Sequence, residues 1–214
     1  ADDVVILALD CKSLEKQLHT IEEYCRKWGL EINISKTKYM LFNGKNTDCC
    51  PSINGSVLEQ VTCYTYLGIT ISSNGKLTQA INCLSNKGLG SLFGLRRTVD
   101  RRFIDAKCHD QLFQTLINPI LTYGCQIWLP LSPFIRSIIK SQSSLSPNSP
   151  SSPNNSSIFN LSLIAKQPYE KVHLRHLKYL LGINRRSCNS AAWGECGSFP
   201  VFITCLSRCV QYFK

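Results

Sequence analysis

The chain has 214 residues, 43% of them hydrophobic, which is enough for one domain with a buried core or for two small ones. Its formal net charge of +10 favours a polyanionic partner, with an anionic membrane surface as the alternative. The sequence has no apolar run of about 18 residues and no signal-peptide pattern, which argues against a membrane-spanning or secreted protein. An intracellular protein, cytoplasmic or nuclear, is therefore expected.

Two adjacent carboxylates, Asp2 and Asp3, precede an apolar run from Val4 to Ala8. The run has the composition of a buried strand. Carboxylates at the mouth of such a strand are costly to desolvate unless a cation neutralises them. Mg²⁺ suits them because it binds one or two carboxylates together with substrate phosphates. The pair is therefore a candidate metal site, and the alternative is a polar cap on a core strand.

A helix is predicted next, with Ser13 as its N-cap and Gly29 at its end. Its apolar residues recur at steps of four and three and form one stripe: Leu14, Leu18, Ile21, Cys25 and Trp28. Residues 30–33 and 38–42 are predicted as two short strands that follow the helix. A strand, a helix and further strands together indicate an α+β arrangement.

Turn residues then mark the next elements. The dipeptide Asn54-Gly55 predicts a hairpin between Ile53 and Val57. Residues 61–72 alternate weakly in polarity and contain two tyrosines, so they are predicted as a strand or a hairpin. This half of the chain is thus expected to supply short strands.

The remainder of the chain has a helical pattern. Three helices are predicted in turn, from Thr78, over roughly residues 100–116, and from Pro119. Residues 141–157 carry no charge and are rich in Ser and Pro, which predicts a disordered linker. Order is expected to resume near Pro168, with a helix over residues 169–181 and short helices after it. This C-terminal piece is expected to be held by weak contacts.

Two residue types could bind a metal ion in the second half. The twelve cysteines are scattered and form no CxxC pair, so reduced thiols are predicted. Zinc is the less favoured alternative for the cysteines near the end: Cys188, Cys196, Cys205 and Cys209. His173 and His176 are three residues apart and could face one metal ion. A basic helix face is favoured instead, because three cations are interleaved with them: Lys171, Arg175 and Lys178.

A cluster of guanidinium groups is the strongest basic feature. It comprises Arg96, Arg97, Arg101 and Arg102. Guanidinium groups bind phosphates through charge-assisted hydrogen bonds, so contact with a nucleic-acid backbone is predicted. The alternative is a solvated helix end that Asp100 and Asp105 partly neutralise.

Three segments together carry a family resemblance: Asp2-Asp3 before its apolar run, Trp28 to Lys38, and Tyr64 to Ile69. In this order and spacing they resemble consecutive motifs of the reverse transcriptases of non-LTR (LINE-type) retrotransposons. The resemblance covers residues 1 to about 72. Softer motifs extend it over residues 116–124, 180–186 and 193–195.

The resemblance implies an α+β fold made of part of a polymerase palm, with short antiparallel strands and one packed helix, followed by a mainly helical thumb and a helical tail. The corresponding divisions are residues 1–72 for the palm, 73–136 for the thumb, 137–165 for the linker and 166–214 for a basic C-terminal segment. The Ser- and Pro-rich run fits the family less well than the other segments do.

The resemblance also implies roles for individual residues. Asp2 would be a ligand of Mg²⁺, with Asp3 as its weaker companion, in a site that holds two ions in the complete enzyme. Lys36 would lie near the departing pyrophosphate, where an ammonium group can protonate or neutralise it. The segment Tyr66-Leu67-Gly68 resembles the primer grip, where Gly68 lets the chain approach a nucleic-acid backbone closely.

The function so implied is RNA-directed DNA polymerisation with an RNA template, a DNA primer and deoxynucleotides as partners. The family's other essential Asp and its fingers belong to sequence upstream of these motifs. We therefore expect this chain to be inactive alone and to need the N-terminal part of the same polyprotein. The alternative is a non-catalytic, basic nucleic-acid-binding remnant of a retroelement.

Overall fold

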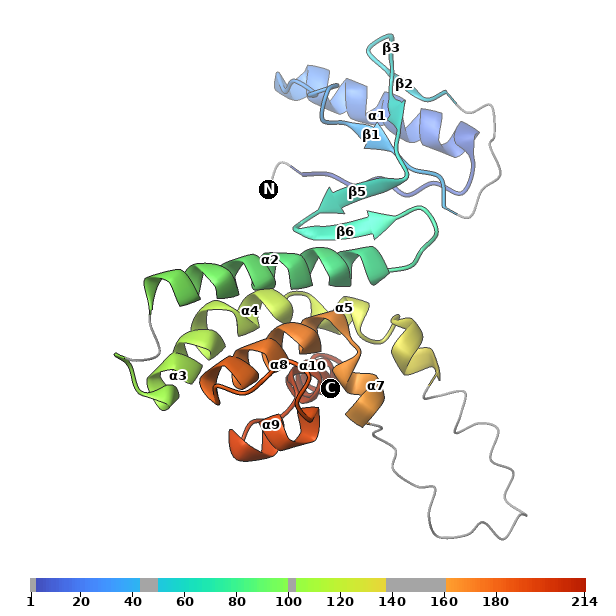
Figure 1. The fold of residues 1–214 in the computed structure, drawn as a ribbon. Helices are drawn as coiled ribbons and strands as arrows, with labels where there is room; N and C mark the ends of the chain where they lie inside the picture. The colour runs from blue at the N-terminus through green and yellow to red at the C-terminus, as the bar shows by residue number, and fades with distance from the viewer. Residues whose placement is uncertain (1–2, 43–49, 100–102, 138–160) are drawn as a thin grey trace, which may run out of the picture. The chain divides into compact units, whose positions relative to one another are not determined.

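The computed structural model describes residues 3–42, 50–99, 103–137 and 161–214. The protein has an α+β fold with many helices and a few short strands (Figure 1). It divides into two compact units. The first unit holds residues 1–66 and 71–75, and the second holds residues 67–70 and 76–214. Along the described residues, no helix is both long enough and apolar enough to cross a bilayer.

In the first unit, helix α1 (Cys11–Trp28) begins earlier than predicted. Its N-cap is Asp10, whose carboxylate accepts a hydrogen bond from the backbone N–H of Ser13 at 2.7 Å. Ser13 as the N-cap is therefore wrong. A carboxylate three residues earlier already satisfies the exposed N–H, and Ser13 lies inside the first turn. Gly29, with φ of 63°, ends the helix as predicted.

The predicted buried strand at residues 4–8 is wrong. Residues 3–8 have no strand geometry, and Val4 and Leu7 are 72% and 79% exposed. A strand needs a neighbour for its backbone hydrogen bonds, and no described strand pairs with this segment. Ile6 alone is partly buried against the core of the unit.

The predicted strand at residues 30–33 is also wrong. The Asn33 side chain accepts hydrogen bonds from the Lys36 N–H at 3.1 Å and from the Ser35 hydroxyl at 2.7 Å. Such local side-chain bonds turn the backbone and compete with strand pairing. The strand predicted over residues 38–42 is confirmed but short, because β1 spans Lys38–Tyr39.

The strands of the first unit pair in two ways. Besides β1 they are β2 (Ser52–Ile53), β3 (Ser56–Val57), β4 (Glu59–Gln60), β5 (Cys63–Tyr66) and β6 (Ile69–Ser72), the last of which is shared with the second unit. The hairpin predicted at Asn54-Gly55 is confirmed, since β2 and β3 are antiparallel and both turn residues have positive φ. However, β1 and β4 are parallel, so the expectation of antiparallel strands holds only in part.

The core of the first unit is small. Leu18 of α1 packs with Ile53 and Leu58, and these are its buried hydrophobic residues. The predicted stripe of α1 is only partly covered, because Leu14 is half-buried and Trp28 is mostly exposed. A few short strands do not offer enough apolar surface to bury a five-turn helix face.

The second unit is built from helices. They are α2 (Thr78–Thr98), α3 (Ala106–Leu116), α4 (Asn118–Leu121), α5 (Cys125–Trp128), α7 (Leu161–Ala165), α8 (Pro168–Leu180), α9 (Asn189–Glu195) and α10 (Val201–Tyr212). The helix predicted from Thr78 is confirmed, and Pro119 lies in the first turn of α4 as expected. Figure 1 shows α2 lying along α4 and α8, and these helices are in contact.

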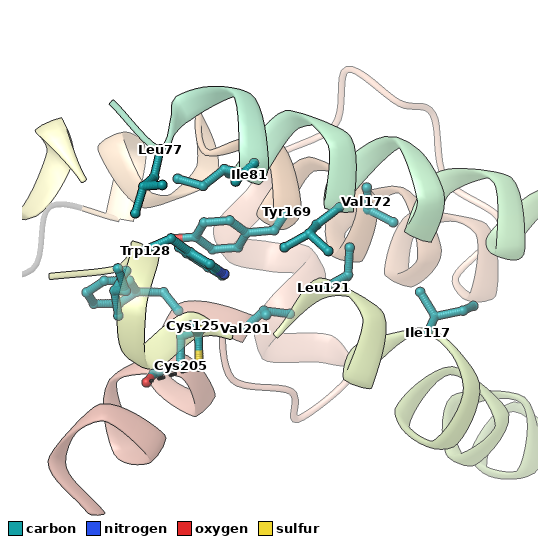
Figure 2. Packing of buried hydrophobic residues seen from close by; sticks show 14 of the residues in the cluster. Leu77, Ile81, Ile117, Leu121, Cys125, Trp128, Tyr169, Val172, Val201 and Cys205 are labelled. Atoms are coloured by element: carbon teal, nitrogen blue, oxygen red, sulfur yellow. Dashed lines mark hydrogen bonds between the residues drawn. The ribbon is translucent and has the colours of Figure 1, made fainter. Parts of the chain in front are cut away.

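One hydrophobic core joins helices from both sides of residues 138–160. Figure 2 shows Ile81 of α2, Trp128 of α5, Tyr169 and Val172 of α8 and Val201 of α10 packed together. The expectation that the C-terminal piece is held by weak contacts is therefore wrong. Its apolar faces are buried against α2 and α5 rather than exposed to water, which stabilises the docked arrangement.

The first helix after residue 160 also begins earlier than predicted, since α7 precedes Pro168 and buries Ile164 and Ala165. The predicted linker over residues 141–157 lies outside the described residues.

Candidate nucleic-acid interface

The acidic pair does not form a metal site within the described residues. Asp3 is exposed, and Asp2 lies outside the described part of the chain. No group of three or more His, Cys, Asp or Glu side chains that could hold a metal ion occurs among the residues that the structure describes. A single exposed carboxylate binds Mg²⁺ only together with further oxygen ligands, such as a second carboxylate and substrate phosphates. The roles of Asp2 and Asp3 remain predictions.

Lys36 has a free side chain on a well-defined turn. The Lys36 and Thr37 N–H groups both donate to the Asn33 carbonyl, at 3.2 and 3.0 Å. The Lys36 ammonium has no hydrogen-bond or ion-pair partner among the described residues, whereas Lys38 pairs with Glu59 at 2.6 Å. Of these two neighbouring lysines, Lys36 is thus the one available to an external anion.

The segment resembling a primer grip forms the tip of the β5–β6 hairpin. Leu67 and Gly68 are the two turn residues, with φ of 47° and 80°. Both are exposed, and Leu67 is 62% exposed. Tyr66 is the last residue of β5 and is half-buried. The sequence thus places an apolar side chain and a glycine at an exposed turn, where another molecule can reach the Leu67 side chain.

Tyr123 supports this tip, and we did not identify it from the sequence as a site residue. Its hydroxyl donates a hydrogen bond to the Leu67 carbonyl at 2.9 Å. A Cβ at Gly68 would lie 3.3 Å from the Tyr123 ring. The Tyr123 carbonyl in turn accepts a hydrogen bond from the Trp128 indole at 2.8 Å. The sequence did contain an indication of this role, because Tyr123 belongs to the softer family motif at residues 116–124.

The arginine cluster separates into residues with different environments. Arg96 is half-buried, donates to the Arg175 carbonyl at 2.6 Å and stacks on the Tyr179 ring at 4.2 Å. Burial lowers the pKa of Arg96. Arg96 is therefore a structural link between α2 and α8 and not a free phosphate ligand. Arg97 is exposed, and Arg101 and Arg102 lie outside the described residues.

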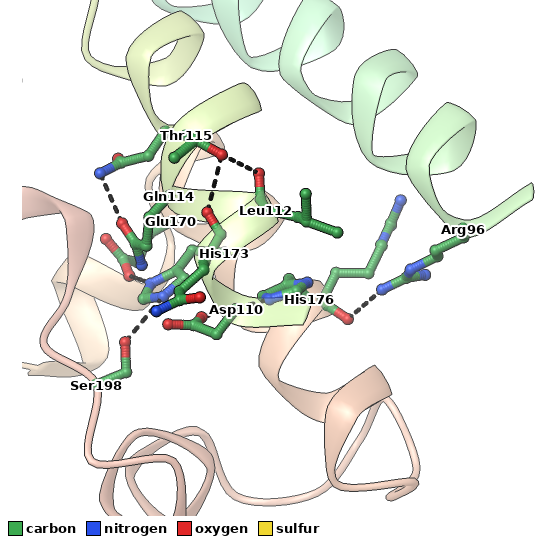
Figure 3. A network of polar contacts seen from close by, with 12 residues as sticks. Arg96, Asp110, Leu112, Gln114, Thr115, Glu170, His173, His176 and Ser198 are labelled. Carbon is green, nitrogen blue, oxygen red and sulfur yellow. Dashed lines mark hydrogen bonds and ion pairs between the residues drawn. The ribbon is translucent and has the colours of Figure 1, made fainter. Parts of the chain in front are cut away.

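The predicted basic face of helix α8 is wrong for Lys178 and for the two histidines, whereas Lys171 is exposed and Arg175 is half-buried. His173, His176 and Lys178 are buried, and each histidine contacts a carboxylate: His173 meets Glu170 at 3.0 Å and His176 meets Asp110 at 3.4 Å (Figure 3). The cations interleaved with these histidines in the sequence suggested an exposed face. The sequence pattern of α8 alone could not show that α3, α9 and α10 cover it. Among the described residues, Glu170 satisfies the buried His173 ring, whereas neither ring nitrogen of His176 makes a regular hydrogen bond.

The pKa values of one such pair follow from its environment. The His176 ring, with Nε2 3.4 Å from the carboxylate, lowers the pKa of Asp110. Burial lowers the pKa of His176, because an imidazolium ion is poorly solvated inside the protein.

The cysteines near the end do not gather around a common point. Cys205 and Cys209 are buried beside Cys125 of α5, while Cys188 is exposed. A hydrogen bond with Cys205 lowers the pKa of Cys125 to about 7, and burial raises the pKa of Cys209 to about 11. Most of the described cysteines are free thiols, as predicted, but Cys11 is disulfide-bonded.

The first part of the chain resembles a known family of enzymes. Residues 1–71 match the family model of reverse transcriptase (RNA-dependent DNA polymerase). The predicted resemblance to retrotransposon reverse transcriptases is confirmed by this match and by the names of the relatives. No solved structure gives a significant match.

Individual relatives agree with this class. The chain is 30% identical over 135 residues to a transposon-derived protein of Caenorhabditis elegans, covering 60% of this chain and 47% of that one. It is 23% identical over 137 residues to the RNA-directed DNA polymerase from mobile element jockey of Drosophila melanogaster, covering 60% and 15%. The probable RNA-directed DNA polymerase from transposon BS of the same species is 25% identical over 138 residues, with the same coverage. The chain thus spans less than half of each of these relatives.

Proposed function

We propose that this chain supplies part of the palm and a helical nucleic-acid-binding region to an RNA-directed DNA polymerase of a retrotransposon. The observation that carries the proposal is the exposed Leu67–Gly68 tip braced by Tyr123. The tip lies in the segment matched to the reverse transcriptase family. The exposed Leu67 side chain and the exposed turn backbone are open to contact with a primer strand, while the Cβ position of Gly68 faces the Tyr123 ring that braces the turn.

The remaining residues have subsidiary roles in this proposal. Lys36, whose ammonium has no partner among the described residues, would approach the phosphates of the incoming nucleotide. Asp2 and Asp3 would contribute carboxylate ligands to Mg²⁺, which supplies Lewis-acid activation in nucleotidyl transfer. Arg97, with Arg101 and Arg102, would contact the phosphates of the template–primer duplex.

The whole activity requires more protein than this chain provides. The chain spans 15% of the jockey and BS polymerases, so the fingers and the further palm carboxylate would come from another part of the same polyprotein. RNA template, DNA primer and deoxynucleotides would be the partners of that assembly. The second candidate function, binding nucleic acid without chemistry, is favoured by the net charge of +10 and by the incomplete set of metal ligands.

Photocrosslinking tests the role of the hairpin tip. A benzoylphenylalanine placed at Leu67 should crosslink to the primer strand of an RNA–DNA hybrid that carries a primer 3′ end. The matched control places the same residue at Val57, which is similarly exposed in a different hairpin. Crosslinking that is no stronger at Leu67 than at Val57 would contradict the assignment of the tip as a primer contact.

A further inference from the structure

The loop after helix α8, residues 182–187, is fixed from inside by one lysine. Lys178 is only 6% exposed, and its ammonium donates to the Arg185 carbonyl at 2.9 Å, the Ser187 carbonyl at 2.7 Å and the Asn189 side chain at 2.6 Å. An ammonium group has three donors, and all three are used here. The lysine therefore binds the loop and the start of α9 to α8 and is not available to an external anion.

The backbone of this loop is ordered by further hydrogen bonds. The Ile183 N–H donates to the Lys178 carbonyl at 3.1 Å, next to Gly182 with φ of 67°, an arrangement that closes the end of α8. The Asn184 side chain accepts from the Arg186 N–H at 2.9 Å. Because the loop carbonyls face Lys178, the side chains of Arg185 and Arg186 are left exposed.

These arginines extend a cationic cluster that includes Arg175 of α8. Arg96, which donates to the Arg175 carbonyl at 2.6 Å, lies close to Arg175 and Arg185, whose repulsion lowers its pKa after the larger effect of burial. Among the described residues, no carboxylate lies within ion-pair distance of Arg175, Arg185 or Arg186. Guanidinium groups without protein counterions form a site for an external anion.

We infer that Arg175, Arg185 and Arg186 form a preorganised binding site for the phosphodiester backbone of a nucleic acid, with Lys178 as the residue that positions the loop. The inference rests on the proposed nucleic-acid-binding function and specifies a surface for it. Guanidinium groups at several points suit phosphates spaced along a strand. Docking on a membrane would need a wide apolar face as well, and Ile183 is the loop's single exposed large apolar residue.

The test measures binding of an RNA–DNA hybrid to the full chain by fluorescence anisotropy at several salt concentrations. The double variant Arg185→Ala/Arg186→Ala should weaken binding about tenfold at moderate salt and reduce the salt slope by about two, one for each lost phosphate contact. The matched control, Lys12→Ala/Lys16→Ala, removes the same charge from exposed positions of α1 and should change both quantities much less.

The positioning role of Lys178 has its own readout. Lys178→Met should weaken binding although every arginine of the site remains, and Asn184→Ala, an exposed change that loosens the same loop, should weaken it in the same direction. Helical content measured by circular dichroism should stay unchanged if only the loop loses its conformation, and it should fall if the whole protein unfolds.

The outcomes distinguish failure of this inference from failure of the proposed nucleic-acid-binding function on which it rests. If the wild-type chain binds the hybrid and the Arg185/Arg186 variant matches its control, the site is wrong and the proposed function stands. If the wild-type chain does not bind, both fail. Stronger binding to vesicles of phosphatidylserine and phosphatidylcholine than to the hybrid, lost in the same variant, would overturn the choice of nucleic acid.

Discussion

The Tyr123 hydroxyl donates a hydrogen bond to the Leu67 carbonyl across 56 positions of sequence, at 2.9 Å. The same tyrosine ring lies against Gly68, so one side chain contacts both residues of the hairpin turn. The tip is therefore held by the helical region that follows it, and its conformation does not depend on the turn residues alone.

Removing this hydroxyl tests the brace directly. Tyr123→Phe keeps the ring against Gly68 and should lower the free energy of unfolding by about 0.5–1.5 kcal/mol, the typical net contribution of one hydrogen bond. Crosslinking to primer from position 67 should fall as well, because the tip becomes less ordered. Urea unfolding and the crosslinking yield are the measurements, and Tyr212→Phe, on an exposed ring, is the control. Equal effects of the two changes would contradict the brace.

A side chain at Gly68 should be strained for two reasons. Its φ of 80° disfavours any residue with a Cβ, and that Cβ would lie 3.3 Å from the Tyr123 ring. Gly68→Ala should therefore cost about 1–2 kcal/mol of unfolding free energy. Gly90→Ala is the matched control, since Gly90 lies within α2 with no atom near its Cβ position. It should stabilise the protein by about 0.5–1 kcal/mol. Melting temperatures that shift in the same direction for both variants would contradict this prediction.

The carboxylate of Glu170 stabilises the contact between α8 and α10. It lies fully buried beside His173 and accepts hydrogen bonds from the Val201 and Phe202 N–H groups, both at 3.3 Å. Pro200, the N-cap of α10, has no side-chain donor or acceptor, so Glu170 acts as the cap from another helix. Glu170→Ala should cost about 3–5 kcal/mol, because partners of a buried charge are left unpaired.

The control for this change is Glu195→Ala, at an exposed carboxylate of α9. It should shift the midpoint of urea unfolding by much less, about 0.5 kcal/mol or below. A Glu170→Ala protein as stable as this control would show that the capping bonds contribute nothing measurable.

Stability should fall on acidification below the usual histidine pKa. Burial lowers the pKa of His176 from 6.5 in the folded protein, so the unfolded chain takes up the proton first as the pH falls below 6.5. The lowered pKa of Asp110 adds a loss at lower pH, since its stabilisation is present above 3.8 and declines as the pH falls through the folded value.

Urea unfolding at about pH 7.5 and about pH 5 measures the first effect, which His176→Gln should reduce. His19→Gln, at an exposed histidine of α1, should leave the dependence unchanged. A free energy of unfolding that is larger at about pH 5 than at about pH 7.5 would contradict the predicted direction of this pH dependence.

The chain alone should not extend a primer. Residues 1–71 match the reverse transcriptase family, but the described residues supply a single exposed carboxylate, Asp3, toward the metal centre. Incubation of the purified chain with an RNA–DNA primer–template, deoxynucleotides and Mg²⁺ or Mn²⁺ should give no extended product. Extension that is abolished by Asp2→Ala would show that the chain is a complete polymerase.

Local chemistry in the sequence determined several elements correctly. Asn54-Gly55 fixed a hairpin because both residues tolerate positive φ, and Gly29 ended α1 for the same reason. The ordered motifs at Asp2-Asp3, Trp28 to Lys38 and Tyr64 to Ile69 predicted the resemblance to reverse transcriptases, which the match over residues 1–71 confirms. These features depend on a few adjacent residues, so no distant contact was needed to predict them.

Only the tertiary structure decided which side chains are free. The sequence predicted Arg96 as a phosphate contact and Lys178 as part of a basic helix face. In the structure Arg96 donates to a carbonyl of α8, and Lys178 donates to carbonyls of the loop that follows α8. Val4 to Ala8 had the composition of a buried strand, but no described strand pairs with it. The physical reason is the same in each case. Burial and hydrogen bonding depend on residues far apart in sequence, and the sequence pattern of one segment does not contain its partners.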